Sequence, residues 1–118
     1  MLAAAALILL SLVELQTATP LAPVSTLALD DIIRCTGLTQ AASELEGGES
    51  GDGRALYDAA LFWSLTAIQA GQNARHAPAA TEAQVTRARI KAVRELTAEN
   101  PAARAHLQRC RDRTPSLG

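Results

Sequence analysis

The chain has 118 residues, a net charge of −1 and only three aromatic residues, one each of Trp, Tyr and Phe. This length allows one domain with a modest core, and a charge so near zero argues against a protein that binds nucleic acid through a generally basic surface. Abundant alanine and the lack of any sustained alternation of apolar and polar residues argue against β-sheets, so we expect an all-α protein.

An uncharged apolar run opens the sequence over residues 1–13 and ends at Glu14. It is too short to span a hydrocarbon core of ~30 Å, but it matches the apolar segment of a secretory signal. Small residues at 17–19 and 26–28 offer cleavage points. We therefore expect residues 1–26 to be a cleavable signal and short leader, and the mature protein to be periplasmic or secreted without a stable membrane span. The alternative is a cytosolic protein in which this run is a buried helix.

The first helix is predicted behind Asp30 and Asp31, because acids in the opening turn interact favourably with the helix dipole. Four glycines within residues 47–53 predict the loop that ends this helix. Its predicted buried face repeats at helical spacing and consists of Leu29, Ile32, Ile33, Thr36, Gly37, Ala41 and Leu45.

The second helix is predicted from about Arg54 to His76, and it is the most apolar of the four. It contains all three aromatic residues, Tyr57, Phe62 and Trp63. Apolar residues lie on nearly every face of it, which is typical of a helix enclosed by its neighbours. We therefore expect this helix to form the centre of the core.

The third helix follows a break at Pro78. Thr81 is predicted to open it, with Gln84 three residues later as the partner in a capping box. Its expected buried stripe is Val85, Ala88, Ala92, Val93 and Leu96, and the residues expected to face water are Arg87, Lys91, Arg94 and Glu95.

The fourth helix is predicted to start at Asn100 and Pro101, a cap followed by a proline at the first helical position, and to run to about Arg111. Residues 27–113 thus predict a small bundle of four helices, and residues 114–118 a tail. The residues expected to be buried in the fourth helix are Ala103, Leu107 and Cys110.

The two cysteines, Cys35 and Cys110, lie in the first and fourth predicted helices. In an exported protein we expect them to form a disulfide. It would close a loop of 75 residues, for which chain entropy gives about 4.5 kcal/mol of stabilisation. The alternative is a pair of unpaired buried thiols in a cytosolic protein.

A metal site is a further alternative at these cysteines. His106 lies four residues before Cys110, so the two side chains share a helix face at a workable ligand spacing, and Cys35 could join them. A fourth ligand would have to be His76 or a carboxylate. Neither cysteine has a second cysteine two to four residues away, so we expect no metal or other cofactor and interpret His106 as a surface residue.

The charges are spread unevenly along the chain. Residues 1–74 carry two basic and eight acidic side chains, a net charge of −6, whereas residues 75–118 carry nine basic and four acidic ones, a net charge of +5. We therefore expect an acidic and a basic face on the folded domain. Arg87, Arg94 and Arg104 are candidates for contacts with an acidic partner on the basic face.

Catalytic motifs are absent from the sequence: it has no Cys-x-x-Cys pair, no Gly-x-Ser-x-Gly elbow and no phosphate-binding glycine loop. We therefore expect a non-enzymatic interaction or stress factor of the bacterial envelope, with an unknown envelope protein as partner and no nucleic acid. The first alternative is a small-ligand or metal carrier in which Tyr57 and Trp63 line a pocket. The second, for a cytosolic protein, is a nucleic-acid-binding helix-turn-helix formed by the third and fourth helices.

The layout of a leader, about ninety helical residues and one disulfide between distant helices resembles that of the small acid-stress chaperones of the bacterial periplasm. Small periplasmic immunity proteins share the same description. The resemblance carries over no site residue. It implies a domain that loosens in acid, as carboxylates such as those of Asp30, Glu44 and Asp58 become protonated.

Overall fold

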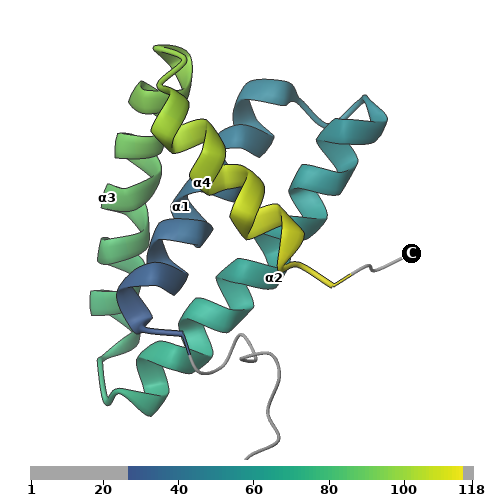
Figure 1. Ribbon diagram of the computed structural model, residues 1–118. Coiled ribbons are helices and arrows are strands. Elements are labelled where there is room, and N and C mark those ends of the chain that lie inside the picture. Colours follow the sequence, from purple (N-terminus) through teal and green to yellow (C-terminus); the bar gives the residue numbers. More distant parts are fainter. Residues whose placement is uncertain (1–26, 116–118) are drawn as a thin grey trace, which may run out of the picture.

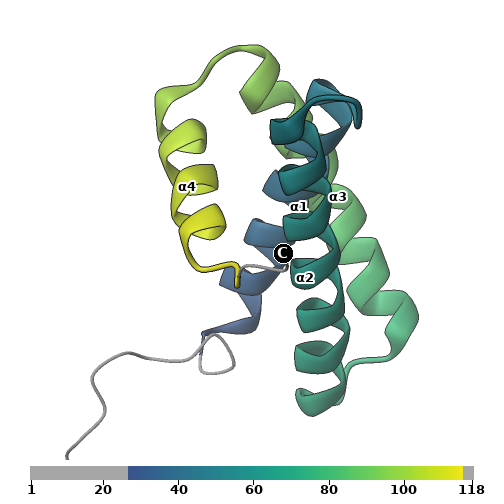
Figure 2. The ribbon, with the colours of Figure 1, turned by 90° about the vertical axis from the view of Figure 1, so that its right-hand side faces the viewer.

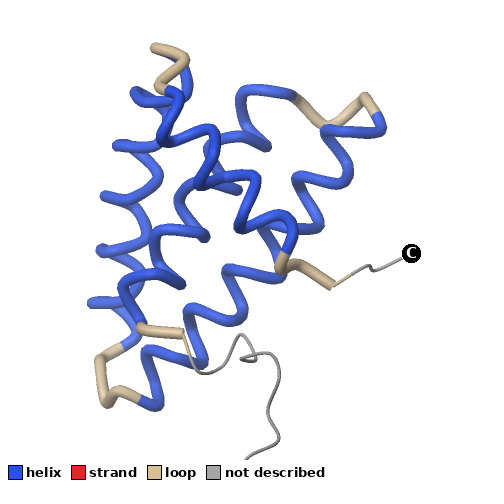
Figure 3. Tube along the Cα trace, in the orientation of Figure 1, coloured by secondary structure: helices blue, strands red, loops and turns tan. Residues whose placement is uncertain are grey.

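The computed structural model describes residues 27–115, and within them it contains four helices and no strand (Figures 1 and 3). This confirms the prediction of an all-α bundle tied by one disulfide. The predicted signal and its cleavage points lie outside the described residues, as does the end of the predicted tail. No helix in the described part of the chain is long and apolar enough to cross a membrane. The helices are α1 (Leu29–Glu46), α2 (Gly51–Asn73), α3 (Pro78–Thr97) and α4 (Pro101–Asp112).

Helix α1 is the central element, with α2 and α3 on either side of it (Figure 1). Both flanking helices pack extensively against α1, but they contact each other at few positions. Helix α4 lies across one side of this three-helix layer, as the view turned by 90° shows (Figure 2). The prediction that the second helix forms the centre of the core is therefore wrong.

The close approach of α1 and α3 depends on a small residue at their contact. A Cβ atom at Gly37 would lie 2.6 Å from the carbonyl carbon of Ala88, so a larger residue would have to push the helices apart. Because the obstacle is backbone, it cannot be relieved by a side-chain rotation alone. The small residue at this contact thus lets α3 approach the central helix closely.

The buried threonines of α1 make hydrogen bonds within the bundle. Thr36 Oγ1 lies 2.8 Å from the carbonyl oxygen of Ile32 and 3.0 Å from that of Trp63, and Thr39 Oγ1 lies 2.8 Å from that of Cys35. Both threonine side chains are completely buried. Satisfied hydroxyl groups of this kind can be buried at little cost.

Helix α2 begins three residues before the predicted start, at Gly51. Ser50 caps it, since its Oγ accepts a hydrogen bond from the backbone N–H of Gly53 at 2.9 Å. The glycine-rich loop is thereby reduced to residues 47–50. The prediction of a loop over residues 47–53 is therefore too long, because Gly51 and Gly53 belong to the first turn of α2 behind the Ser50 cap.

The next boundary also differs from the prediction. Helix α2 ends at Asn73 rather than His76, and α3 begins at Pro78, a residue suited to the first helical position because it lacks an N–H. The predicted capping box is therefore wrong. Thr81 and Gln84 lie inside the helix, and Thr81 Oγ1 and Gln84 Oε1 are buried without a hydrogen-bond partner.

The start of α4 agrees with the prediction, because Asn100 Oδ1 accepts a hydrogen bond from the backbone N–H of Ala103 at 2.9 Å. On α3, Ala92 is buried as expected, while the rest of the predicted stripe is only half-buried. Glu95, which was expected to face water, is half-buried and pairs with Arg34 of α1, with Oε1 and Nη1 2.7 Å apart.

Candidate functional site

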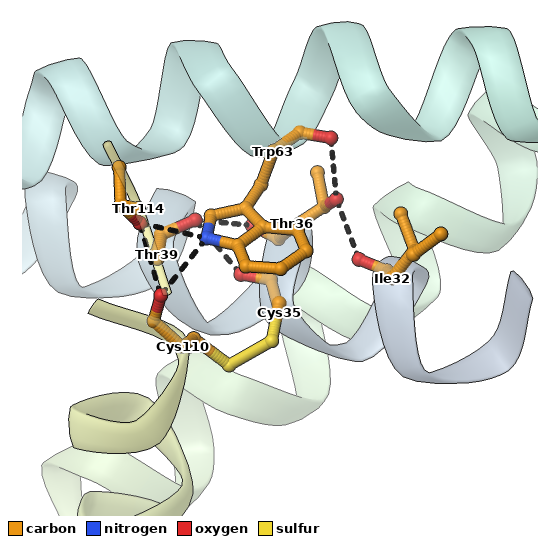
Figure 4. Close-up of a disulfide and its surroundings, with 7 residues drawn as sticks. All are labelled: Ile32, Cys35, Thr36, Thr39, Trp63, Cys110 and Thr114. Carbon is orange, nitrogen blue, oxygen red and sulfur yellow. Dashed lines mark hydrogen bonds between the residues drawn. A yellow bond between two sulfur atoms is a disulfide. The ribbon is translucent and has the colours of Figure 1, made fainter. Parts of the chain in front are cut away.

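The disulfide joins α1 to α4 in the middle of the core. Cys35 and Cys110 have their Cα atoms 5.5 Å apart, and their exposed fractions are 5% and 1%. The indole of Trp63 lies beside them (Figure 4). Its Nε1 donates to the carbonyl oxygen of Cys110 at 3.2 Å and to Thr114 Oγ1 at 3.0 Å. Trp63, one of the two predicted pocket residues, is completely buried and belongs to the core.

His106 lies next to the disulfide rather than on the open surface. One of its ring nitrogens and the two sulfurs of Cys35 and Cys110 all lie within 4.8 Å of one another. The side chain is half-buried rather than fully exposed, because α4 turns this face toward α1. Burial lowers the pKa of His106, and the positive charges of Arg34 and Arg109 lower it further.

Two carboxylates near His106 act against this lowering of its pKa, those of Asp31 and Glu95. Glu95 itself is held by Arg34, whose hydrogen bond lowers the pKa of the Glu95 carboxyl. The charged groups around the imidazole are thus two cations, Arg34 and Arg109, and two anions, Asp31 and Glu95. The lowered pKa of His106 favours the neutral ring, which has one nitrogen available to accept a hydrogen bond or bind a metal.

A groove runs between α2 and α3 with α1 as its floor. One cavity of about 290 Å³ has Thr36 and Gln40 of α1 at its base, Ile68 of α2 on one wall and Val85 of α3 on the other. Its lining is mainly apolar. A second cavity of about 250 Å³ continues from it, because both are lined by Gln40 and Ser64. We call the two cavities together the α2–α3 groove; among the described residues, none from α4 lines it.

Helix α2 carries large apolar side chains that face solvent, and three of them, Tyr57, Leu61 and Ile68, line the groove. Tyr57, Leu61, Leu65 and Ile68 are 56%, 45%, 66% and 52% exposed. The expectation that α2 is enclosed on nearly every face is thus wrong. Its buried stripe consists of Leu56, Ala59, Ala60, Trp63 and Ala67, and the exposed stripe lies beside it. The spacing of Tyr57, Leu61, Leu65 and Ile68 was visible in the sequence as a second apolar stripe.

At the end of the groove near the α2–α3 turn, Thr81 lies in the wall with 4% of its surface exposed. A Cβ atom at Gly71 would meet the Thr81 side chain, so this glycine makes room for it. His76, the predicted fourth metal ligand, also lines this end of the groove and does not belong to the cysteine–histidine cluster.

The predicted partner contacts do not form one cluster with the groove. Tyr57 lines it, but Arg87 and Arg94 are exposed positions of α3 that line neither of its cavities. Arg104 is exposed on α4 and pairs with Glu99, with 3.3 Å between Nη1 and Oε1. The structure therefore separates the aromatic and basic candidates.

Some of the unevenly distributed charges form ion pairs between helices. Glu44 of α1 pairs with Arg89 of α3 at 3.2 Å, and Asp52 of α2 pairs with Arg111 of α4 at 2.7 Å. Each pair links a residue of the acidic half to one of the basic half. The guanidinium of Arg111 also lowers the pKa of Asp52.

No protein-family model, curated protein or solved structure matches this chain.

Proposed function

We propose that this protein is a non-catalytic binding protein of the bacterial envelope and that the α2–α3 groove receives an amphipathic helix of a partner protein. The observation that carries the proposal is the exposed apolar stripe of α2 beside an apolar cavity. Contiguous exposed apolar surface of this kind marks interaction sites in proteins. Grooves between helices commonly receive the apolar face of a partner helix through residues at i, i+4 and i+7.

The dimensions of the groove fit such a helix. From Tyr57 to Gln72, the α2 residues that line it extend over about 22 Å at 1.5 Å per residue. A partner helix of about fifteen residues would cover this length. The cavity between Ile68 and Val85 has room for one large apolar side chain of the partner, which is the kind of anchor that dominates interface energies.

The charges along the groove indicate the chemistry of the partner. Glu82 lines the deeper cavity and takes part in none of the ion pairs of residues 27–115. Arg89 lines the other cavity, but Glu44 already neutralises it. A partner helix with a basic residue beside its apolar anchors would pair with Glu82, whereas an acidic one would be repelled.

The compartment is part of the proposal. Export rests on the apolar run of residues 1–13, and the Cys35–Cys110 bond supports it because disulfides persist in oxidising compartments. The intact mass of protein recovered from cells tests export. A chain shortened at its amino end that takes up two alkyl groups only after reduction is expected, and a full-length chain with free thiols would contradict it.

The groove is tested with a photo-crosslinking amino acid placed at Leu61. We expect cross-links in cells to one partner segment with apolar residues at helical spacing, and a synthetic peptide of that segment to bind the purified protein. Ile68→Glu should weaken the binding of this peptide by about tenfold or more, because the substitution would place a charge against the apolar anchor residue of the peptide. Ile90→Glu is the matched control, since Ile90 is 43% exposed but lines neither groove cavity.

Two results would contradict the proposal. One is a set of cross-links from Leu61 that does not differ from the set obtained with the crosslinker at Ile90. The other is peptide binding that survives Ile68→Glu as well as it survives Ile90→Glu.

A small apolar ligand is a second candidate occupant, because the deeper cavity of about 290 Å³ lies at the lower end of the sizes typical of ligand pockets. The lining contains Glu82 but no Lys or Arg, which disfavours an anionic molecule. Native mass spectrometry of the protein from cells would show a retained molecule. Val85→Phe, which fills the cavity, should abolish that extra mass.

A further inference from the structure

We propose that Cys35, Cys110 and His106 form a redox-dependent metal site: once a dithiol has reduced the disulfide, the two thiolates and the imidazole bind a thiophilic divalent ion such as Zn²⁺. This site is independent of the α2–α3 groove and of the function proposed for it. The structure brings the three ligand atoms together from two helices, within 4.8 Å of one another.

The distances suit tetrahedral zinc after a small rearrangement. Zinc–sulfur bonds of about 2.3 Å and a zinc–nitrogen bond of about 2.0 Å separate neighbouring ligand atoms by roughly 3.5–3.8 Å in a tetrahedron. The Cα atoms of Cys35 and Cys110 are 5.5 Å apart. After reduction the two sulfurs are no longer bonded, and rotation of the two thiolate side chains about their Cα–Cβ bonds can separate them toward these distances.

Both the position and the protonation state of His106 suit a metal ligand. It lies four residues before Cys110 on α4, so both side chains point to the same face of the helix. Burial and nearby arginines keep its pKa below the ordinary value, which favours the neutral ring with a free lone pair on one nitrogen. The groups around it carry both signs: Arg34 and Arg109 are positive, and Asp31 and Glu95 are negative.

The metal site forms in two steps, reduction of the disulfide and binding of the ion. The dithiol gives two electrons and two protons, the Cys35–Cys110 bond breaks into two thiols, and the dithiol becomes a disulfide. The incoming divalent ion then displaces both thiol protons to water, and the two thiolate charges neutralise it. A water molecule completes the fourth position. The metal thereby replaces the covalent link between α1 and α4.

The test uses the full protein, reduced with dithiothreitol, freed of it under anaerobic conditions and titrated with Co²⁺. We expect binding of one ion, with thiolate-to-cobalt charge-transfer bands and the intense visible bands of a tetrahedral site. Oxidised protein should give neither. Zn²⁺ should displace Co²⁺, and His106→Gln should weaken binding by about tenfold or more. His76→Gln is the matched control, because His76 lies outside the cluster and should leave binding unchanged.

Far-UV circular dichroism covers the case in which reduction loosens the fold. If helicity falls on reduction, Co²⁺ should restore it in the wild type and in His76→Gln but not in His106→Gln. The proposal is overturned if the reduced protein gives no thiolate–cobalt bands, if His106→Gln binds as tightly as His76→Gln, or if urea-unfolded protein binds as tightly as the folded form.

Discussion

The side chain of Trp63 is hydrogen-bonded to the backbone of Cys110, with 3.2 Å between the indole Nε1 and the carbonyl oxygen. The same Nε1 lies 3.0 Å from Thr114 Oγ1, and that hydroxyl donates to the same carbonyl at 2.9 Å. One residue of α2 thus holds the end of α4 beside the disulfide. The chain just after α4 takes part as well, through Thr114.

Trp63→Phe should lower the free energy of unfolding by about 1–3 kcal/mol, because it removes a buried donor and leaves a cavity. Urea unfolding followed by far-UV circular dichroism measures this, since the substitution also removes the tryptophan signal. Tyr57→Phe is the control, because Tyr57 is 56% exposed and should change stability little. Equal stability of the two variants would contradict a role of the indole in holding α4.

Loss of the disulfide should destabilise the bundle strongly. Replacing Cys35 and Cys110 together by alanine should cost about 2–5 kcal/mol, since the loop of 75 residues is no longer closed in the unfolded chain. Thermal unfolding of this double variant and of the oxidised wild type gives the comparison. A change in melting temperature of only a degree or two would show that α4 is held by packing alone.

Gly37→Ala should destabilise the protein although alanine is the better helix former, because its Cβ would meet the backbone of Ala88 at 2.6 Å. We expect a loss of about 1–3 kcal/mol in the free energy of unfolding, as is usual for overpacking. Gly48→Ala is the control, since a Cβ there meets nothing within 4 Å. A second replacement, Ala88→Gly, removes one of the obstructing atoms and should recover part of the loss.

Stability should rise with pH across a window just below the ordinary histidine value. The pKa of His106 in the folded protein is lower than in the unfolded chain, so in that window the unfolded state binds more protons. The stabilisation is complete above about 6.5 and is lost as the pH falls through the folded pKa. Chemical denaturation between pH 7.5 and 5 should therefore show a slope that His106→Gln removes and His76→Gln keeps.

Acid should weaken the contact of α1 with α3. Arg34 lowers the pKa of Glu95, so this pair contributes stability above the ordinary carboxyl value of 4.5, and the contribution is lost as the pH falls through the lowered value. Glu95→Gln should flatten the stability profile below pH 4.5, while Glu49→Gln, in an exposed loop, should not. Near-UV circular dichroism and dye binding at pH 3 would then reveal whether the bundle loosens.

The sequence predicted the number of helices, the N-cap of α4 and the pairing of the cysteines, because these depend on local signals and on the count of thiols. It did not predict which helix is central. Apolar content placed the second helix there, whereas the bundle selects α1, whose Gly37 allows α3 to approach. Helix packing depends on backbone separation as much as on hydrophobicity, and a single sequence does not show which small residue meets a partner.

Each candidate site combines residues from one helix, whose spacing is visible in the sequence, with residues from a distant helix. The spacing of His106 and Cys110 predicted a shared face, but only the crossing of α4 over α1 places Cys35 beside them. For the α2–α3 groove, the spacing of Leu61 and Ile68 was available, but the second wall comes from Val85 of another helix. Local sequence patterns therefore did not predict the contacts between helices that are distant in the sequence.

The disulfide also determines what a protease could do to this molecule. Every peptide bond between Cys35 and Cys110 lies inside the covalent ring that the cysteines close, including those of the exposed loop at residues 47–50. A single cut there would leave the two pieces joined, so the nicked chain would keep its mass apart from one added water. It would separate into fragments only when the sulfur bridge is reduced and the helices are unfolded.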